Sequence, residues 1–174
     1  YAFSENYVLP LSHDEVVHGK KSFLDKIFGS YEDKFRQMRT ALLLMMTYPG
    51  KKLLFMGTEY APFREWDYAS ELEWFMLDYP PHKAMQAYVA ALNRFYLAHP
   101  QLWEIDFDEE GFSWLLPDEA EKNLVAYCRH AMAGEALVCA VSFSGAENRD
   151  VQLCVPAGAY ETVFDSVGDG SIPH

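Results

Sequence analysis

The chain has 174 residues, of which 50% are hydrophobic, 16% aromatic and 23% charged, so it can fold around a core of its own. Its formal net charge of −12 argues against two kinds of partner, the phosphate backbone of nucleic acid and an anionic membrane surface. Three cysteines imply no disulfide framework and favour a reducing, cytoplasmic setting, and no apolar run approaches the roughly 20 residues of a membrane span.

The charge divides the chain into two parts. Residues 1–103 carry 11 basic and 12 acidic side chains, whereas residues 104–174 carry 3 basic and 14 acidic ones. The net charge therefore changes from −1 to −11 just after His99 and Pro100. A change of this size along a chain suggests a second structural unit, so we expect one domain over 1–103 and another over 104–174.

The first part is predicted to alternate strand and helix. Ser30 and Asp33 have the spacing of a capping box, which begins a helix that ends before Pro49. The expected elements are a strand at 7–11, this helix, a continuously apolar strand at 52–56 that is typical of burial on both faces, and a helix at 82–99. Two such β/α units make up about a quarter of a (β/α)₈ TIM barrel, which takes roughly 250 residues. We therefore expect the last quarter of a barrel and a piece of a longer protein.

The second part changes to an apolar pattern of period two. Five short strands are expected, at 112–116, 123–129, 136–143, 151–155 and 160–164. This spacing predicts an all-β domain, an antiparallel β-sandwich that lacks its last strands. The alternation places Trp114 inward, and Cys128, Cys139 and Cys154 are predicted to be buried thiols in the core.

A cluster of chemically active side chains follows the first strand. His13, Asp14, Glu15, His18 and Lys20 lie within eight residues. Polar side chains at the carboxyl end of a barrel strand project into the mouth where barrel active sites lie. A carboxylate there can stabilise the positive charge that develops in glycosyl transfer, and an imidazole can donate to a sugar hydroxyl.

Two other interpretations of the cluster remain open. His13 and His18 are five residues apart, not the four of a zinc-protease helix, while Glu15 and His18 fit a di-metal spacing whose partner helices are not evident. The second interpretation, which composition alone favours, is a solvated polar loop. We predict no metal and no cofactor.

Residues 12–20, Ser-His-Asp-Glu-Val-Val-His-Gly-Lys, resemble a fingerprint of the 1,4-α-glucan (glycogen) branching enzymes. Their His13-Asp14 core resembles the fourth conserved region of the α-amylase superfamily. The resemblance continues through residues 55–60, Phe-Met-Gly-Thr-Glu-Tyr, and through residues 64–66, Arg-Glu-Trp. It extends to the segments at 104–108 and 111–114 and covers most of the chain.

The resemblance implies a central (β/α)₈ barrel followed by a C-terminal β domain. It also implies a retaining double displacement that cuts an α-1,4-glucan chain and transfers the segment to a 6-hydroxyl, which makes an α-1,6 branch. Asp14 matches the carboxylate that stabilises the transition state, and His13 matches the imidazole beside it that holds the sugar. The nucleophile Asp and the acid/base Glu belong to motifs of earlier strands, upstream of this chain. We therefore expect the 174 residues alone to be inactive.

Three further residues are candidates for binding the glucan. Glu15 lies in the motif itself, Glu59 follows the second strand, and Trp66 offers an aromatic face to a sugar ring. A structural ion pair for Glu59 and a loop anchor for Trp66 are equally consistent with the sequence. Two other functions are also open, an α-amylase-type hydrolase or other transglycosylase with the same fold, and a non-catalytic glucan-binding module formed by residues 104–174.

Overall fold

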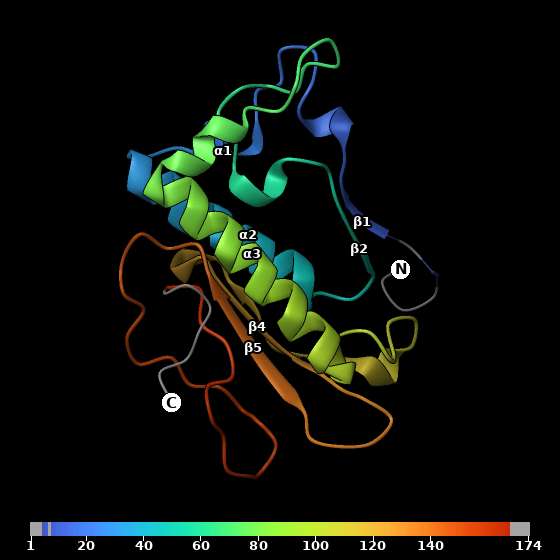
Figure 1. The fold of residues 1–174 in the computed structure, drawn as a ribbon. Helices are drawn as coiled ribbons and strands as arrows, with labels where there is room; N and C mark the ends of the chain where they lie inside the picture. The colour runs from blue at the N-terminus through green and yellow to red at the C-terminus, as the bar shows by residue number, and fades with distance from the viewer. Residues whose placement is uncertain (1–4, 7, 168–174) are drawn as a thin grey trace.

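A computed structural model of the chain describes residues 5, 6 and 8–167, and Figure 1 traces its elements. The first part contains β1 (Val8–Leu11), the short helix α1 (Phe23–Lys26), α2 (Tyr31–Thr47), β2 (Lys51–Leu54) and α3 (Pro80–Ala98). The second part contains β3 (Phe112–Glu119), β4 (Leu124–Arg129) and β5 (Leu137–Ser142). Single 3₁₀ turns lie at His13–Glu15, Thr58–Tyr60, Trp74–Asp78, Pro100–Leu102, Glu109–Gly111 and Ala120–Lys122.

The two long helices begin where residues suited to a first turn stand. Ser30 caps α2, and both bonds of the capping box with Asp33 are present, as the sequence predicts. Helix α3 begins at Pro80, two residues before the predicted start, because proline is accommodated in a first helical turn, where its missing N–H has no partner to lose. Apolar side chains of α2 and α3 then pack against each other to form the main core, around residues such as Met38, Leu42, Met85, Tyr88 and Leu92.

The strands of the first part form a parallel pair. Val8 lies opposite Lys51 and Leu11 opposite Leu54, and no other strand pairs with β1 or β2 among the described residues. Leu11 and Leu54 pack against the helical core, whereas Leu53 is 43% exposed. Residues 52–56 are predicted to form a strand buried on both faces. For β2 this prediction is wrong in the described structure, because the helices cover one face only.

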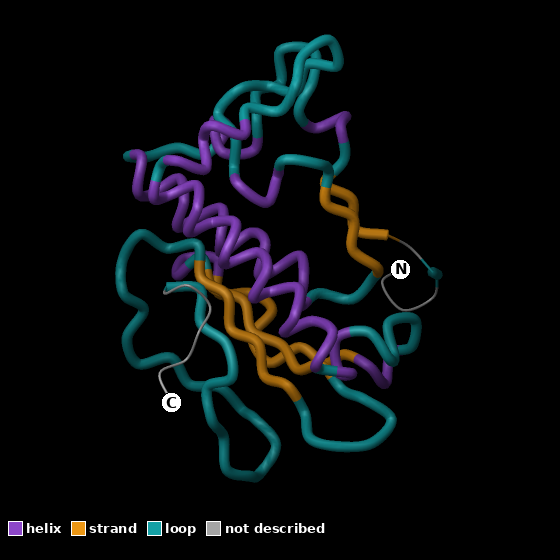
Figure 2. Tube along the Cα trace, in the orientation of Figure 1, coloured by secondary structure: helices purple, strands orange, loops and turns teal. Residues whose placement is uncertain are grey.

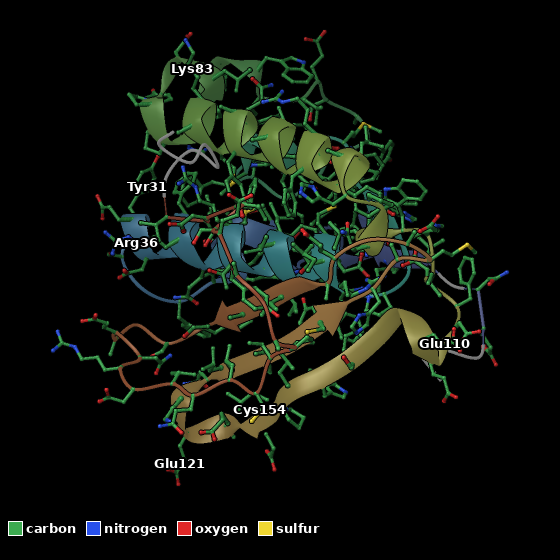
Figure 3. The ribbon with its side chains drawn as sticks, turned by 90° about the horizontal axis from the view of Figure 1, so that it is seen from below. Tyr31, Arg36, Lys83, Glu110, Glu121 and Cys154 are labelled. Atoms are coloured by element: carbon green, nitrogen blue, oxygen red, sulfur yellow. The ribbon has the colours of Figure 1, made fainter. Side chains whose placement is uncertain are left out.

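The second part forms an antiparallel sheet in the order β3-β4-β5, which confirms that part of the expected fold. Helix α2 lies between α3 and this sheet, so the molecule has three layers, with Lys83 on the outer layer and Glu121 at the far rim of the sheet (Figure 3). The aromatic rings of Tyr48, Phe112 and Tyr127 fill the space between α2 and the sheet.

The prediction of strands at 151–155 and 160–164 is wrong. Residues 143–167 are drawn as loop in Figure 2 and contain no strand. Val163 and Phe164 pack against the helical core, where the Phe164 ring lies 4.8 Å from that of Phe95. Val163 and Phe164 are therefore covered by the helices, whereas Val155, Tyr160 and Val167 stay exposed. Among the described residues, β5 pairs with β4 only.

The predicted burial of two side chains also needs correction. Cys128 and Cys139 are buried thiols, as expected, but Cys154 is exposed because it lies in the segment that does not join the sheet (Figure 3). Trp114 contacts the rings of Tyr48, Phe112 and Tyr127 with one side, yet 45% of it is exposed. Trp114 lies opposite Tyr127 on β3, the edge strand of this sheet, so its ring is covered on one side and open on the other.

A buried ion pair joins the two parts of the chain. The Arg129 guanidinium on β4 donates from Nη2 to Asp106 Oδ1 at 2.7 Å, and both side chains are fully buried. Its Nη1 donates to the carbonyl of Thr47 at the end of α2, and its Nε to the carbonyl of Gly111. Lys51 on β2 donates to the second oxygen of Asp106 at 3.0 Å. One ion pair thus ties together α2, β2, β4 and the segment between the two parts.

Lys52, the neighbour of Lys51, lies largely buried beside this pair. Its amine donates to the carbonyl of Tyr48 and stands 5.7 Å from the centre of the Tyr96 ring. Burial lowers the pKa of Lys52 to about 7, and the positive charges of Arg129 and Lys51 act in the same direction, against the opposing effect of Asp106.

Replacing Arg129 by Met should destabilise the fold by about 3–5 kcal/mol, because Asp106 stays buried with a single remaining partner. Chemical denaturation of the parent and the variant measures this difference. Arg149→Met is the matched control, since the Arg149–Glu147 pair is exposed and its loss should cost less than about 1 kcal/mol. Equal effects of the two substitutions would contradict the role assigned to Arg129.

The stability of the fold should also depend on pH through Lys52. Since the pKa of Lys52 falls from 10.5 to about 7 on folding, the unfolded chain binds more protons between these values. The free energy of unfolding should therefore rise with pH across this window, relative to a Lys52→Met variant that lacks the amine. Lys83→Met, which removes an exposed amine from α3, is the control. A pH-independent difference between the parent and Lys52→Met would contradict this prediction.

Candidate active site

The parallel register of β1 and β2 brings together the two segments that follow them. The carbonyl of Leu11 accepts a hydrogen bond from the amide of Phe55 at 2.8 Å, so the pairing continues to the point where both strands end. Two loops then extend from the same edge, residues 12–22 and residues 55–73, and they lie side by side in Figure 1. Carboxyl ends of adjacent parallel strands are where ligand sites of α/β folds occur.

The motif that follows β1 is organised by Ser12. The Ser12 hydroxyl accepts the amide of Asp14, while the amide and hydroxyl of Ser12 both donate to Glu15 Oε2, at 2.7 and 2.9 Å. These bonds are a capping box that closes the 3₁₀ turn His13–Glu15. The turn leaves the side chains of His13 and Asp14 pointing to solvent, 55% and 72% exposed, with Nε2 of His13 3.3 Å from Oδ1 of Asp14.

The capping box also lowers the pKa of the Glu15 carboxyl group. The hydrogen bond from the Ser12 hydroxyl is the largest of the effects that lower the pKa of Glu15 below its usual value. Slight burial acts in the opposite direction, and the amide of Ser12 reinforces the lowering. Ser12 therefore holds Glu15 through Oε2.

Aromatic rings support the imidazole of His13. Its ring centre lies 6.1 Å from that of Phe55 and 6.3 Å from that of Trp66, and the Phe55 and Trp66 rings meet edge-on at 5.0 Å. The amide of Trp66 donates to the carbonyl of Val16 at 3.0 Å. The structure thus brings Trp66, from the loop after β2, to the motif that follows β1.

Glu59 stands apart from this group. It lies half-buried in the 3₁₀ turn Thr58–Tyr60, after the end of β2. Its carboxylate makes no hydrogen bond or ion pair with any residue that the structure describes, so the structural ion pair considered from the sequence is not formed there. The position of Glu59 at the same edge as Asp14 follows from the parallel strand pair alone.

A residue that the sequence did not mark as part of the site is Glu65. Its two carboxylate oxygens accept the amides of Gly19 and Lys21, each at 2.8 Å, and these bonds lower the pKa of Glu65. Between the two amides, Lys20 extends its amine to the carbonyl of Asp14 at 2.7 Å. Gly19 signals a turn, but no local pattern identifies an acceptor more than 40 residues away.

The described residues hold no group of three or more His, Cys, Asp or Glu side chains placed to bind a metal ion. Within that same part of the chain, none of the helices has both the length and the apolar character needed to cross a bilayer.

Comparison with known proteins confirms the resemblance that the motifs predict. Residues 114–172 match the family described as "Alpha amylase, C-terminal all-beta domain". The 1,4-alpha-glucan branching enzyme GlgB of Halothermothrix orenii is 46% identical over 170 residues, which are 95% of this chain and 27% of that enzyme. The enzymes of the same name from Pseudomonas putida and Aquifex aeolicus are 43% and 44% identical, over 91% and 92% of this chain and 22% and 26% of their own length. The chain thus spans about a quarter of the length of these relatives.

Replacing Ser12 by Ala should raise the pKa of Glu15 toward its ordinary value, because the largest cause of its lowering is removed. The matched control is Ser30→Ala in the equivalent capping box of α2, which should raise the pKa of Asp33 and leave that of Glu15 unchanged. Titration of the carboxyl carbons by NMR measures both groups. A pKa of Glu15 that stays lowered in Ser12→Ala would show that another group holds this carboxylate.

Proposed function

We propose that this chain, a relative of the 1,4-alpha-glucan branching enzymes over nearly its whole length, is the part of such an enzyme that carries the transition-state-stabilising carboxylate, Asp14. The relatives are named as branching enzymes, and their sequences are 43–46% identical to this chain. This similarity supports assigning the same reaction to the protein to which the chain belongs. The single observation that carries the assignment is the place of Asp14, exposed in a rigid turn at the carboxyl end of β1.

We also propose how the chain is divided. Residues 1–103 are the last β/α units of a catalytic (β/α)₈ barrel, which is supported by the parallel pair β1-β2 and by the alternation with α2 and α3. Residues 104–174 are the C-terminal β domain, which is supported by the antiparallel sheet and by the family match over 114–172. In a barrel, the edge at which β1 and β2 end is the active-site face.

The proposed chemistry is a retaining double displacement on an α-1,4-glucan chain, with transfer of the cut segment to a 6-hydroxyl. The anomeric carbon becomes positively charged in both transition states, and the Asp14 carboxylate stabilises that charge. Its backbone amide is bound by Ser12 and its backbone carbonyl by Lys20, so the base of this side chain is fixed while its tip stays accessible. Little reorganisation is then needed when the charge appears.

The neighbouring side chains are proposed to bind the glucan. The imidazole of His13, supported by Phe55 and Trp66, can donate to a sugar hydroxyl. The free oxygen of Glu15 and the carboxylate of Glu59 can accept from hydroxyls, and the indole of Trp66 can pack against a pyranose face. Since a glucan is neutral, hydrogen bonds and ring contacts provide the recognition.

Two further carboxylates, the nucleophile and the acid/base, belong to sequence motifs that these 174 residues do not contain. We therefore propose that the chain is inactive by itself and acts only as part of a longer enzyme. A cytoplasmic setting is supported by three free cysteines, of which Cys154 is exposed, since an exposed thiol persists best in a reducing compartment.

A chimeric enzyme tests the proposal. In it, this chain replaces the matching 170 residues of the Halothermothrix orenii branching enzyme, which supplies the rest of the protein. The chimera should form α-1,6 linkages, and Asp14→Asn in it should lower turnover by at least about 100-fold, because the carboxylate loses its charge but little of its volume. Linkage analysis of the glucan product measures the activity.

The matched control in this chimera is Asp118→Asn, which neutralises an exposed carboxylate on β3, far from the site in sequence and in a different sheet. It should leave branching unchanged. Near-normal branching by Asp14→Asn would refute the catalytic assignment, and activity of the isolated 174-residue chain would refute the proposed division of labour.

A further inference from the structure

We propose that Glu65 is a positioning residue of this active site, which holds the loop 16–21 and, through Lys20, the backbone of Asp14. The inference rests on the proposed function, because it concerns how the same carboxylate is placed. Glu65 makes no contact with the side chain of His13 or Asp14 among the described residues, so its action is exerted through other groups.

The first step is the contact between Glu65 and the loop. Oε1 accepts the amide of Gly19 and Oε2 accepts the amide of Lys21, both at 2.8 Å. An ionised carboxylate that takes one N–H on each oxygen forms a strong and directional pair of bonds. A bridge of this kind fixes two backbone positions in relation to each other.

The backbone conformation of the loop is one that such a pair of bonds would stabilise. His18 and Lys21 have φ values of 58° and 68°, in the left-handed region that side chains with a Cβ rarely adopt, and Gly19 has 79°. Among the described residues, the only backbone–backbone hydrogen bond across this stretch runs from the amide of Lys20 to the carbonyl of Val17, at 3.2 Å. The amides that Glu65 accepts lie within this stretch, so its carboxylate favours a conformation that the loop would otherwise seldom adopt.

The second step leads from the loop to the catalytic turn. Lys20 lies between the two bridged residues, so both of its peptide neighbours are fixed. Its Nζ donates to the carbonyl of Asp14 at 2.7 Å. The carbonyl of Asp14 belongs to the 3₁₀ turn His13–Glu15, and a shift of this group moves the carboxylate that projects from the same residue.

The residues beside Glu65 make the connection rigid. Arg64 pairs with Asp67 at 3.0 Å and lies 4.0 Å from Glu73, which ties the segment to the rest of its own loop. Trp66 donates its amide to Val16 and packs its ring near His13. Two consecutive residues of the loop after β2, Glu65 and Trp66, therefore bond to the segment after β1, while Arg64 holds them to their own loop. The bonds from Gly19 and then Lys21 lower the pKa of Glu65, which keeps it ionised at neutral pH.

The alternative is that Glu65 only stabilises the fold. The two possibilities differ in kinetics, because a positioning residue affects the transition state more than the binding of substrate. Glu65→Gln offers one acceptor oxygen and one NH₂ group, so it can satisfy one of the two amides but not both. Lys20→Met removes the amine that reaches Asp14 and leaves the bridge intact.

Both substitutions are made in the chimeric enzyme, singly and together. We expect Glu65→Gln and Lys20→Met each to lower kcat by about 10- to 100-fold while KM stays within about threefold, since misplacing a catalytic group impairs turnover. If Glu65 acts through Lys20, the double variant should be no more than about twofold worse than the more impaired single variant. Glu71→Gln, which changes an exposed glutamate of the same segment that no described residue bonds, should leave kcat unchanged.

Several outcomes would overturn the inference. Normal kcat in Glu65→Gln would do so, as would a double variant whose loss equals the product of the two single losses. If Glu65→Gln does not fold, Lys20→Met decides the question, because it removes one exposed contact and a normal kcat there rules out the connection. Failure of the proposed function itself is distinguishable, since it would appear as an active Asp14→Asn chimera.

Discussion

The Arg129–Asp106 ion pair is the contact on which the relation between the two parts of the chain depends. A guanidinium can be buried only if its donors are satisfied, and three of them are, by Asp106, Thr47 and Gly111. These partners come from the segment between the parts, from the end of α2 and from the residue before β3. The full set of bonds to Arg129 therefore forms only when the helices, the connecting segment and the sheet are all in place. The ion pair thus stabilises the arrangement of the two parts relative to each other.

The same dependence on distant partners governs the candidate site. The parallel register of β1 and β2 is set by backbone bonds, and it decides which loops become neighbours. The details of the site are then made by side chains that bond backbone groups of the neighbouring loop, Glu65 to Gly19 and Lys21 and Lys20 to Asp14. Such bonds leave His13 and Asp14 free for a ligand, because the groups that hold the loop are different from the groups that face solvent.

Features with a local cause were predictable from the sequence. The capping box of Ser30 and Asp33, the helices and the strands β3, β4 and β5 follow from neighbours a few residues apart. Features that depend on distant pairs were not. The segment 151–164 has the alternation of a strand, yet it forms none, and the ring of Phe164 packs against that of Phe95 on α3. The partners of Arg129 and Glu65 lie far away along the chain, and neither residue type indicates which distant group it will meet. The likeness to branching enzymes made Asp14 a candidate for the site, but a motif does not indicate which distant groups hold the backbone of that residue.

The uneven charge has a consequence for how the proposed substrate is recognised. The excess of acidic residues lies in residues 104–174, while the candidate site is in the part with a net charge of only −1. A neutral glucan gains nothing from a long-range field, so selection must come from contacts at the site. There the ionised groups Glu15 and Glu65 are engaged by Ser12 and by backbone amides, which neutralise much of their field. Among the residues that the structure describes, the Asp14 carboxylate has only the nearby imidazole of His13 beside it. In the role proposed for Asp14, this leaves the negative charge of its carboxylate available to the positive charge that develops on the sugar.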